Sequence, residues 1–216
     1  MIRSMIRTIT SQYHLNAITL GEFSKIKTGG MNFEIWAFHA EGLGHVSAMT
    51  ASGFLGLMKM DTLIINPTEK DMPLFSYDRV QAMGNDTLIF ELYDTILEKT
   101  ELSRVGEVKK NYTNLPDHNL GQHWYDPIKL AVSMSKKGKK NHTPVFDKCA
   151  REYLDAYLED AKHADYCDPA GKQARASSYV EGLLTNGGPS TDLFKKGIGD
   201  EKTAALFHNV LFGTAR

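Results

Sequence analysis

The sequence predicts an α+β protein of one domain spanning residues 1–216, with an antiparallel sheet in its first half and helices mainly in its second. Three observations predict it. The length of 216 residues suits a single domain with a sizeable core. The first half holds short stretches rich in β-branched and aromatic residues, and the second half holds apolar residues at helical spacing. Connections as short as those between the stretches can join only antiparallel strands, because a parallel crossover needs about a dozen residues or more.

The first half is predicted to hold one helix followed by several strands. Ile2, Met5 and Ile9 recur at helical spacing and predict a helix over residues 2–15. Strands are predicted over residues 32–40, 45–51, 79–82 and 87–93, and a central strand is predicted at 63–65, the end of a long apolar run over 55–66. Turns are expected at 41–44 and 84–86, and within 70–78 a proline-led loop is expected to end where Asp78 opens the next strand.

The second half is predicted to be helical. A helix followed by a loop is expected from residue 94, and Thr143-Pro144 then offers a cap residue followed by proline at the first helical position. Asp168-Pro169 repeats that start, and Gly187 ends the helix it opens. A last helix is expected over about 200–212.

Composition narrows the functional classes. The formal net charge of −1 gives no overall attraction to nucleic acid or to an anionic membrane. Two cysteines are too few for a disulfide framework, and the start of the chain has no apolar segment typical of a signal peptide, so a soluble cytoplasmic protein is expected. The eight histidines include no HxH or HxxxH pair, so no metal site is expected.

Asp78 is the strongest candidate for chemistry. It stands between the predicted loop and the next strand, with Phe75, Tyr77 and Val80 around it in the sequence. Burial among such neighbours disfavours the ionised carboxylate, so its pKa is expected to rise and it could donate a proton near neutral pH. The alternative is that Asp78 only caps the turn.

A second candidate is a cluster of lysines in a chain of almost zero net charge. Its members are Lys136, Lys137, Lys139 and Lys140. We expect an exposed loop here that meets an acidic or a phosphate-bearing partner. The alternative is an ordinary solvated loop.

The order of segments resembles the ferredoxin-dependent bilin reductases, with red chlorophyll catabolite reductase as a more distant relative. The family's strand, Pro-[Leu/Ile]-Phe-x-x-Asp and second strand are matched by residues 63–67, Pro73 to Asp78, and 87–93. The helix at 146–162 is similar to the family's helix with a Tyr-Leu-x-x-Tyr-Leu pattern. The closing segment from Asn186 to Phe212 is similar in order and spacing.

This resemblance implies an α/β/α sandwich around a central antiparallel sheet. It implies a chemistry without a permanently bound metal or flavin, in which reduced ferredoxin or flavodoxin supplies electrons and Asp78 protonates the pigment. Phe75, Tyr77 and Asn186 are expected to contact the ligand.

The chain also departs from the family's pattern at two places. The place of a family histidine falls near Asp61 or Thr62, and Asn186-Gly187 replaces Asn-Asp, so a second proton donor is absent or displaced to Asp192.

Two functions from different classes follow. The first is an oxidoreductase acting on CH–CH groups of a linear tetrapyrrole or similar conjugated ligand, with the lysine loop beside the cavity opening to dock an acidic electron-transfer protein. The second is a non-catalytic tetrapyrrole-binding or carrier protein of the same fold. A third class, a phosphate- or RNA-binding module, is disfavoured because no aromatic residues interleave with the lysines.

Overall fold

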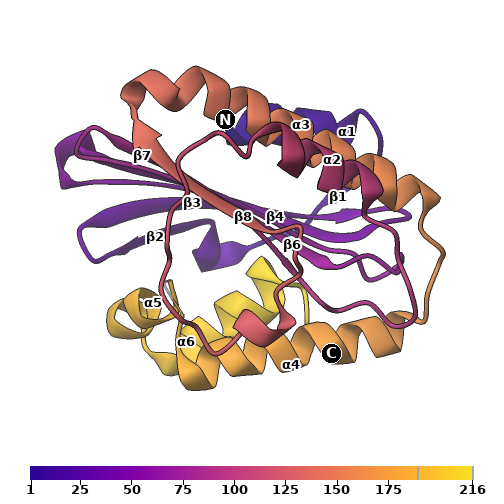
Figure 1. Ribbon diagram of the computed structural model, residues 1–216. Coiled ribbons are helices and arrows are strands. Elements are labelled where there is room, and N and C mark those ends of the chain that lie inside the picture. Colours follow the sequence, from indigo (N-terminus) through magenta and orange to yellow (C-terminus); the bar gives the residue numbers. More distant parts are fainter. Residues whose placement is uncertain (189, 216) are drawn as a thin grey trace.

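A single antiparallel sheet lies between two layers of helices in the computed structural model, which describes residues 1–188 and 190–215 (Figure 1). The strands are β1 (Leu15–Ala17), β2 (Lys25–Thr28), β3 (Met31–Ala40), β4 (Gly44–Gly53), β5 (Met58–Asn66), β6 (Leu74–Ala82), β7 (Asn85–Tyr93) and β8 (Met134–Lys139). Their order is β1-β3-β4-β5-β6-β7-β8, and β2 also pairs with β3. Every pairing is antiparallel, as predicted.

The helices divide between the two faces of the sheet. They are α1 (Ile2–Thr10), α2 (Ser103–Asn111), α3 (Thr143–His163), α4 (Pro169–Asn186), α5 (Thr191–Ile198) and α6 (Asp200–Ala205), which continues into the π-helical segment Leu206–Leu211. Figure 1 shows α1, α2 and α3 on one face, and α4, α5 and α6 on the other. The three-layer α/β/α sandwich that was expected is therefore present.

Strand alternation sends successive side chains into two separate cores. On the face covered by α1 and α3, Phe75 and Phe90 of the sheet pack against Tyr153 and Tyr157 of α3. The rings of Phe90 and Tyr153 are stacked with centroids 4.0 Å apart. The other core joins Ile35, Met49 and Ile64 of the sheet to α4, α5 and the π-helical segment.

The two predicted helix starts differ in their chemistry. The Asp168 carboxylate accepts hydrogen bonds from the backbone N–H groups of Ala170 and Gly171, at 3.2 and 2.9 Å, so it caps α4 as predicted. At α3, Thr143 donates its hydroxyl to the Asp86 carboxylate on β7, at 2.6 Å. This bond ties the start of α3 to the sheet, in place of the cap that was expected.

Several predicted elements are wrong. Residues 74–77 belong to β6 and not to a loop, and the lysine segment forms β8 and the short turn Lys140–His142. The helix expected from residue 94 begins only at Ser103, and the first helix ends at Thr10. Pairing with β7 explains the lysine strand, because backbone hydrogen bonds to a neighbour override a local sequence that reads as a loop.

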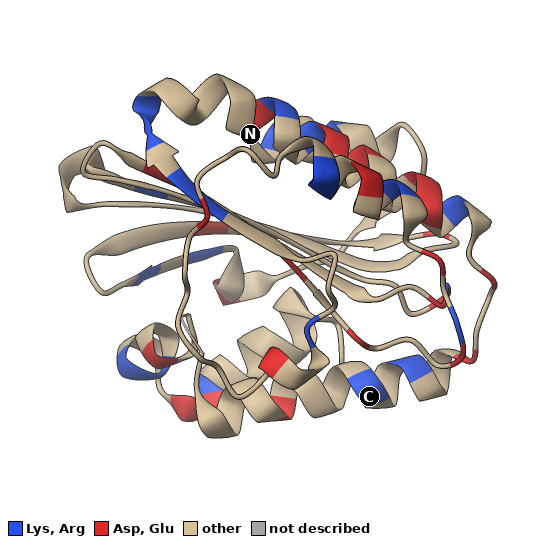
Figure 2. Ribbon diagram, viewed as in Figure 1, with Lys and Arg blue, Asp and Glu red and all other residues tan. Residues whose placement is uncertain are grey.

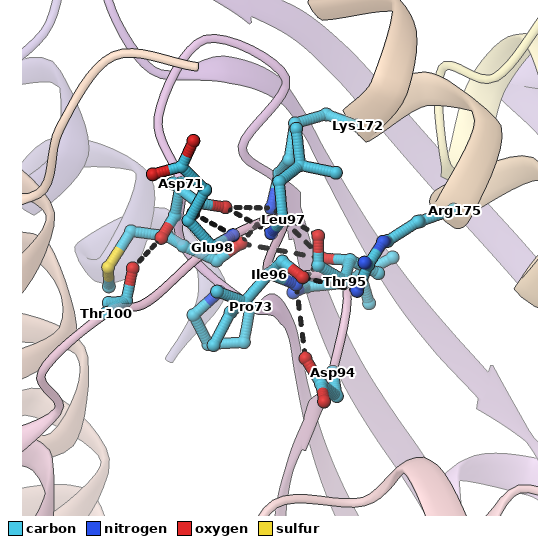
Figure 3. Close-up of polar contacts among 12 residues, drawn as sticks. Asp71, Pro73, Asp94, Thr95, Ile96, Leu97, Glu98, Thr100, Lys172 and Arg175 are labelled. Atoms are coloured by element: carbon cyan, nitrogen blue, oxygen red, sulfur yellow. Dashed lines mark hydrogen bonds and ion pairs between the residues drawn. The ribbon is translucent and has the colours of Figure 1, made fainter. Parts of the chain in front are cut away.

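Buried polar contacts fasten α4 to the loops that precede β6 and follow β7, at one end of the strands (Figure 3). Lys172 has no exposed surface and donates to the carbonyls of Met72 and Thr95, with the Asp71 carboxylate 3.6 Å away. Burial lowers the pKa of Lys172 to about 8, and the Asp71 charge opposes that shift. Asp71 in turn accepts from the backbone N–H groups of Leu97 and Glu98, at 2.7 and 2.9 Å.

The carbonyls at the end of the π-helical segment are satisfied by side chains of the sheet. The donors and acceptors are His45 Nε2 to Val210 (2.8 Å), Ser47 Oγ to Leu211 (2.6 Å) and Asn66 Nδ2 to Phe212 (2.8 Å). Burial lowers the pKa of His45 to about 4, so it remains neutral. These bonds fix the closing segment against the sheet.

None of the helices in the described part of the chain has the length and apolar character needed to cross a bilayer.

Candidate functional site

A cavity of about 240 Å³ lies between the sheet and the helical layer formed by the C-terminal third of the chain. Side chains of β4 to β7 form one wall, and α4, the start of α5 and the π-helical segment form the opposite one. The loop around Leu120 and His123 borders it at the side. Most of the lining is apolar, with a few polar groups that face inward, which is the usual character of a small-molecule site.

Asp78 is one of these polar groups. Its Oδ1 accepts a hydrogen bond of 2.5 Å from Thr62, directly opposite on β5, and Ser76 Oγ lies 3.5 Å from Oδ2. Burial raises the pKa of Asp78 to about 6, and the Glu91 charge adds to that shift while the bonds from Thr62 and Ser76 oppose it. Among the described residues, its hydrogen bonds go to side chains of the sheet and none to backbone amides, which contradicts the capping alternative.

Glu91 is a second carboxyl group in the cavity, which the sequence prediction missed. It stands opposite Ser76 on β7, so it is a diagonal neighbour of Asp78 on the same face of the sheet. Glu91 is buried, accepts a 2.6 Å hydrogen bond from the Tyr93 hydroxyl, and forms an ion pair with Lys129 at 3.4 Å. A two-residue turn at 83–84 sets this register, and recognising that turn would have placed Glu91 beside Asp78.

Aromatic rings form another part of the lining. Tyr93 and Tyr179 have ring centroids 4.3 Å apart, and Tyr125 meets Tyr93 edge-on at 5.5 Å. The His123 ring stacks on Tyr125 with centroids 4.9 Å apart, and within the described chain its Nδ1 is buried without a hydrogen-bond partner. Burial raises the pKa values of Tyr93 and Tyr179 well above their ordinary value, so both hydroxyls keep their protons. Such a wall suits a flat conjugated ligand that also offers polar edges.

Phe75 and Tyr77 do not line this cavity, against expectation. Side chains alternate along β6. Ser76, Asp78 and Val80 point to the cavity face, so Phe75 and Tyr77 point to the opposite layer. There Phe75 packs against Tyr157 with ring centroids 4.8 Å apart, and both residues belong to the core under α3. The apolar surroundings of Asp78 come instead from other elements, including Val80, Ile89 and Phe212.

Asn186 and Asp192 also lie outside the cavity. Both are exposed, one at the end of α4 and the other in the first turn of α5. Gly188 and Thr191, from the same connection, are the residues that line the cavity. A second proton donor displaced to Asp192 is therefore contradicted by its position.

The four lysines do not share one environment. Lys136 is buried and donates to the Leu115 carbonyl at 3.0 Å and to the Asp117 carboxylate at 2.6 Å, so it is not part of an exposed patch. Lys137, Lys139 and Lys140 are exposed. The register places Lys137 beside Thr87 and Thr87 beside Val80, so Lys137 stands on the face of the sheet that bears the cavity.

Of three comparisons with known proteins, only the comparison with solved structures gives a match. No family model matches the chain, and no curated protein matches it. Among solved structures, the chain is similar to phytochromobilin synthase from tomato, determined in complex with biliverdin, with a TM-score of 0.79 and 12% sequence identity. The match covers 99% of this chain and 82% of that one. The chain therefore has the fold of that protein.

In the described residues, no group of three or more His, Cys, Asp or Glu is placed to hold a metal ion.

Proposed function

We propose that this chain binds a linear tetrapyrrole or a similar conjugated ligand in the cavity and reduces it with electrons from an acidic ferredoxin-type or flavodoxin donor. Asp78 would supply a proton. The observation that carries the proposal is a carboxyl group with a pKa of about 6 at an otherwise largely apolar cavity. A fold shared with a phytochromobilin synthase whose structure contains biliverdin supports the class of ligand.

The chemistry requires a proton donor inside the cavity. Reduction of one carbon–carbon double bond consumes two electrons and two protons, and each electron makes the bound pigment more basic. A carboxyl group with a pKa of about 6 is protonated in about a tenth of the molecules at pH 7, against fewer than about one in a thousand at its ordinary value. Hydrogen bonds from Thr62 and Ser76 hold this carboxyl in the wall of the cavity. The second proton comes from reprotonated Asp78 or from another polar group of the lining.

The rest of the lining excludes water and holds the pigment. Phe207, Leu211 and Phe212 cover the cavity on the helical side, and the tyrosine rings offer faces and edges for stacking. Exclusion of water strengthens the interaction between the carboxyl and the charge that develops on the ligand. Exposed Lys137, Lys139 and Lys140 supply positive charge to attract the electron donor, whereas buried Lys136 takes no part.

A carrier protein of the same fold is the second candidate. Where the resemblance places a second donor, this chain has Asn186-Gly187, and Asn186 is exposed and does not line the cavity. Loss of that donor favours binding without reduction. The two candidates differ in whether electrons supplied to the bound pigment end in a shorter conjugated system.

One experiment separates them. Biliverdin is titrated into the protein while the absorption spectrum is recorded, and reduced ferredoxin is then added without oxygen. A reductase shows saturable spectral change and then a blue shift as conjugation shortens, and a carrier shows only the first change. Val80→Trp fills the cavity and abolishes binding, whereas Ser52→Trp, at an exposed position of β4, leaves it intact. If the wild-type protein leaves the pigment spectrum unchanged, both candidates are wrong.

A further inference from the structure

One end of the sheet collects the apolar tips of two neighbouring hairpins. The pairing register places one row of residues across the sheet: Met31, Gly53, Met58, Ala82, Asn85 and Lys139. The turns at 54–57 and 83–84 and the segment 140–142 therefore emerge at the same end. Four of the six large apolar side chains that are exposed in the described chain lie here: Phe54, Leu55, Leu57 and Met83, with exposed fractions of 57%, 104%, 68% and 88%.

The backbone at these tips is unusual for the residues it carries. Phe54, Leu55 and Met83 have φ angles of 51°, 57° and 51°. Side chains with a Cβ rarely adopt this left-handed region, where glycine or asparagine is the common choice. Neither burial nor backbone preference explains large apolar residues at these positions. A contact with a partner molecule would account for both features.

Positive charge surrounds the apolar tips. Residues 27–32, 52–59, 81–86 and 137–142 make up this end of the sheet, and their basic residues are Lys27, Lys59, Lys137, Lys139 and Lys140. All five are exposed. Asp86 is the acidic residue of these segments, and it is buried and bonded to Arg79. Figure 2 shows the blue of Lys and Arg where β8 leads into the turn before α3.

The same end of the sheet approaches the cavity. Met60 and Val80 line the cavity, and each stands two residues along its strand from the row described above. Two residues of a strand span about 7 Å. A protein that rested on the tips would therefore bring its own redox centre near a ligand bound over Met60 and Val80.

We infer that this end of the sheet is the docking surface for an acidic electron-transfer protein, with Phe54, Leu55, Leu57 and Met83 as its apolar centre and the five lysines as its charged rim. The inference rests on the proposed function and names the surface through which electrons arrive. An apolar centre inside a charged rim is the usual arrangement of a protein–protein interface, and a patch this small fits the low end of interface size, where transient redox encounters lie. The rim selects a negatively charged partner and speeds its approach.

The test measures binding of a plant-type [2Fe–2S] ferredoxin, in its oxidised form, to the bilin-free protein by calorimetry at low and at physiological salt. The triple variant Leu55→Ser, Leu57→Ser, Met83→Ser is expected to raise Kd by about tenfold or more at both salt concentrations. Lys59→Gln, Lys139→Gln, Lys140→Gln together raise Kd mainly at low salt, because salt screens exposed charges. Tyr166→Ser removes an exposed ring beyond the opposite end of β5 and leaves Kd unchanged.

The outcomes are distinct. Unchanged Kd in the triple variant, with its urea unfolding midpoint equal to that of the wild type, overturns the inference. A second result also overturns it: the wild type binds phosphatidylserine vesicles, and the triple variant loses that binding but keeps its ferredoxin Kd. The surface would then be a lipid-binding surface. Since no bilin is present, ferredoxin binding that the triple variant leaves unchanged contradicts this inference alone. Failure of biliverdin to bind contradicts the proposed function, and failure of the wild type to bind ferredoxin contradicts both the docking surface and the electron donor of the proposed function.

Discussion

Asp78 owes its chemistry to a position that destabilises its charged form. Burial in the cavity outweighs the hydrogen bonds from Thr62 and Ser76, and the pKa rises from its ordinary 3.8 to about 6. The folded protein therefore holds a proton at pH values where the unfolded chain has released it. By linkage, the folded state loses stability as pH rises through the window from about 4 to about 6.

The first prediction is that Asp78→Asn stabilises the protein at neutral pH. The amide keeps the shape of the side chain and has no charge to bury, so the free energy of unfolding at pH 7.5 rises by about 1–3 kcal/mol. At pH 4.5 the gain falls to about a third, because Asp78 is then largely neutral in the folded protein. Urea unfolding at the two pH values measures this. A variant less stable than the wild type at pH 7.5 contradicts it.

The second prediction concerns Glu91. Its negative charge raises the pKa of Asp78, so Glu91→Gln lowers that pKa by about half a unit to one unit. Reduction that needs neutral Asp78 then declines at lower pH than in the wild type. Single-turnover reduction of bound biliverdin, followed from pH 5 to pH 8, reports the shift. Glu98→Gln, at an exposed position outside the cavity, serves as control, and an unchanged profile for Glu91→Gln would refute the coupling.

Single residues also show what the sequence could predict. The direction of the Asp78 pKa shift was predicted correctly from the sequence, and burial is its cause as expected. The identity of the residues that face it was not, because strand alternation turns Phe75 and Tyr77 to the other layer. Glu91 reaches the cavity through the register that the turn at 83–84 sets, and His123 reaches it through a loop whose course no local pattern records.

The elements over the cavity are held by buried polar contacts to the sheet and its loops. Lys172 fastens α4 to the carbonyls of Met72 and Thr95, and sheet side chains bind the last carbonyls of the π-helical segment. π-helical turns often occur at functional sites. Here the turn presents Phe207 and Leu211 to the ligand space. Satisfied polar contacts of this kind define one position for each element, which a purely apolar contact specifies less sharply.

The third prediction tests the Lys172 contact. Lys172→Met leaves the two carbonyls and the buried Asp71 carboxylate without their cation, so the free energy of unfolding falls by about 3–5 kcal/mol. Arg175→Met is the matched control, since Arg175 lies on the same helix, is exposed and donates to the Ile96 carbonyl of the same loop. Arg175→Met is expected to lower the free energy of unfolding by less than about 1 kcal/mol. Equal losses in the two variants would show that burial of Lys172 adds nothing.

Element by element, prediction succeeded where local signals agree with tertiary packing. The strands of the central sheet have β-rich stretches bounded by turns, and the helices α3 and α4 combine helical periodicity with proline or aspartate at their starts. The short polar strands β1, β2 and β8 were missed, because edge strands are defined by a neighbour's hydrogen bonds and not by their own composition.

At the scale of the whole molecule, the sheet separates a closed core from a hollow one. The face under α1 and α3 is filled by aromatic packing, whereas the face under α4 and the π-helical segment keeps a cavity with two carboxyl groups. One end of the same sheet carries the apolar tips and the exposed lysines. In this account the sheet connects the site of electron entry to the site of proton transfer.

The measurement that tests this account most directly is the rate at which reduced ferredoxin converts biliverdin bound to Asp78→Asn. The account predicts that this variant binds the pigment with an affinity close to that of the wild type and reduces it at least about 100-fold more slowly, because the transferable proton is gone. Asp155→Asn, on the exposed side of α3, makes the same chemical change away from the cavity and keeps the wild-type rate. Reduction by Asp78→Asn at the wild-type rate would contradict the account.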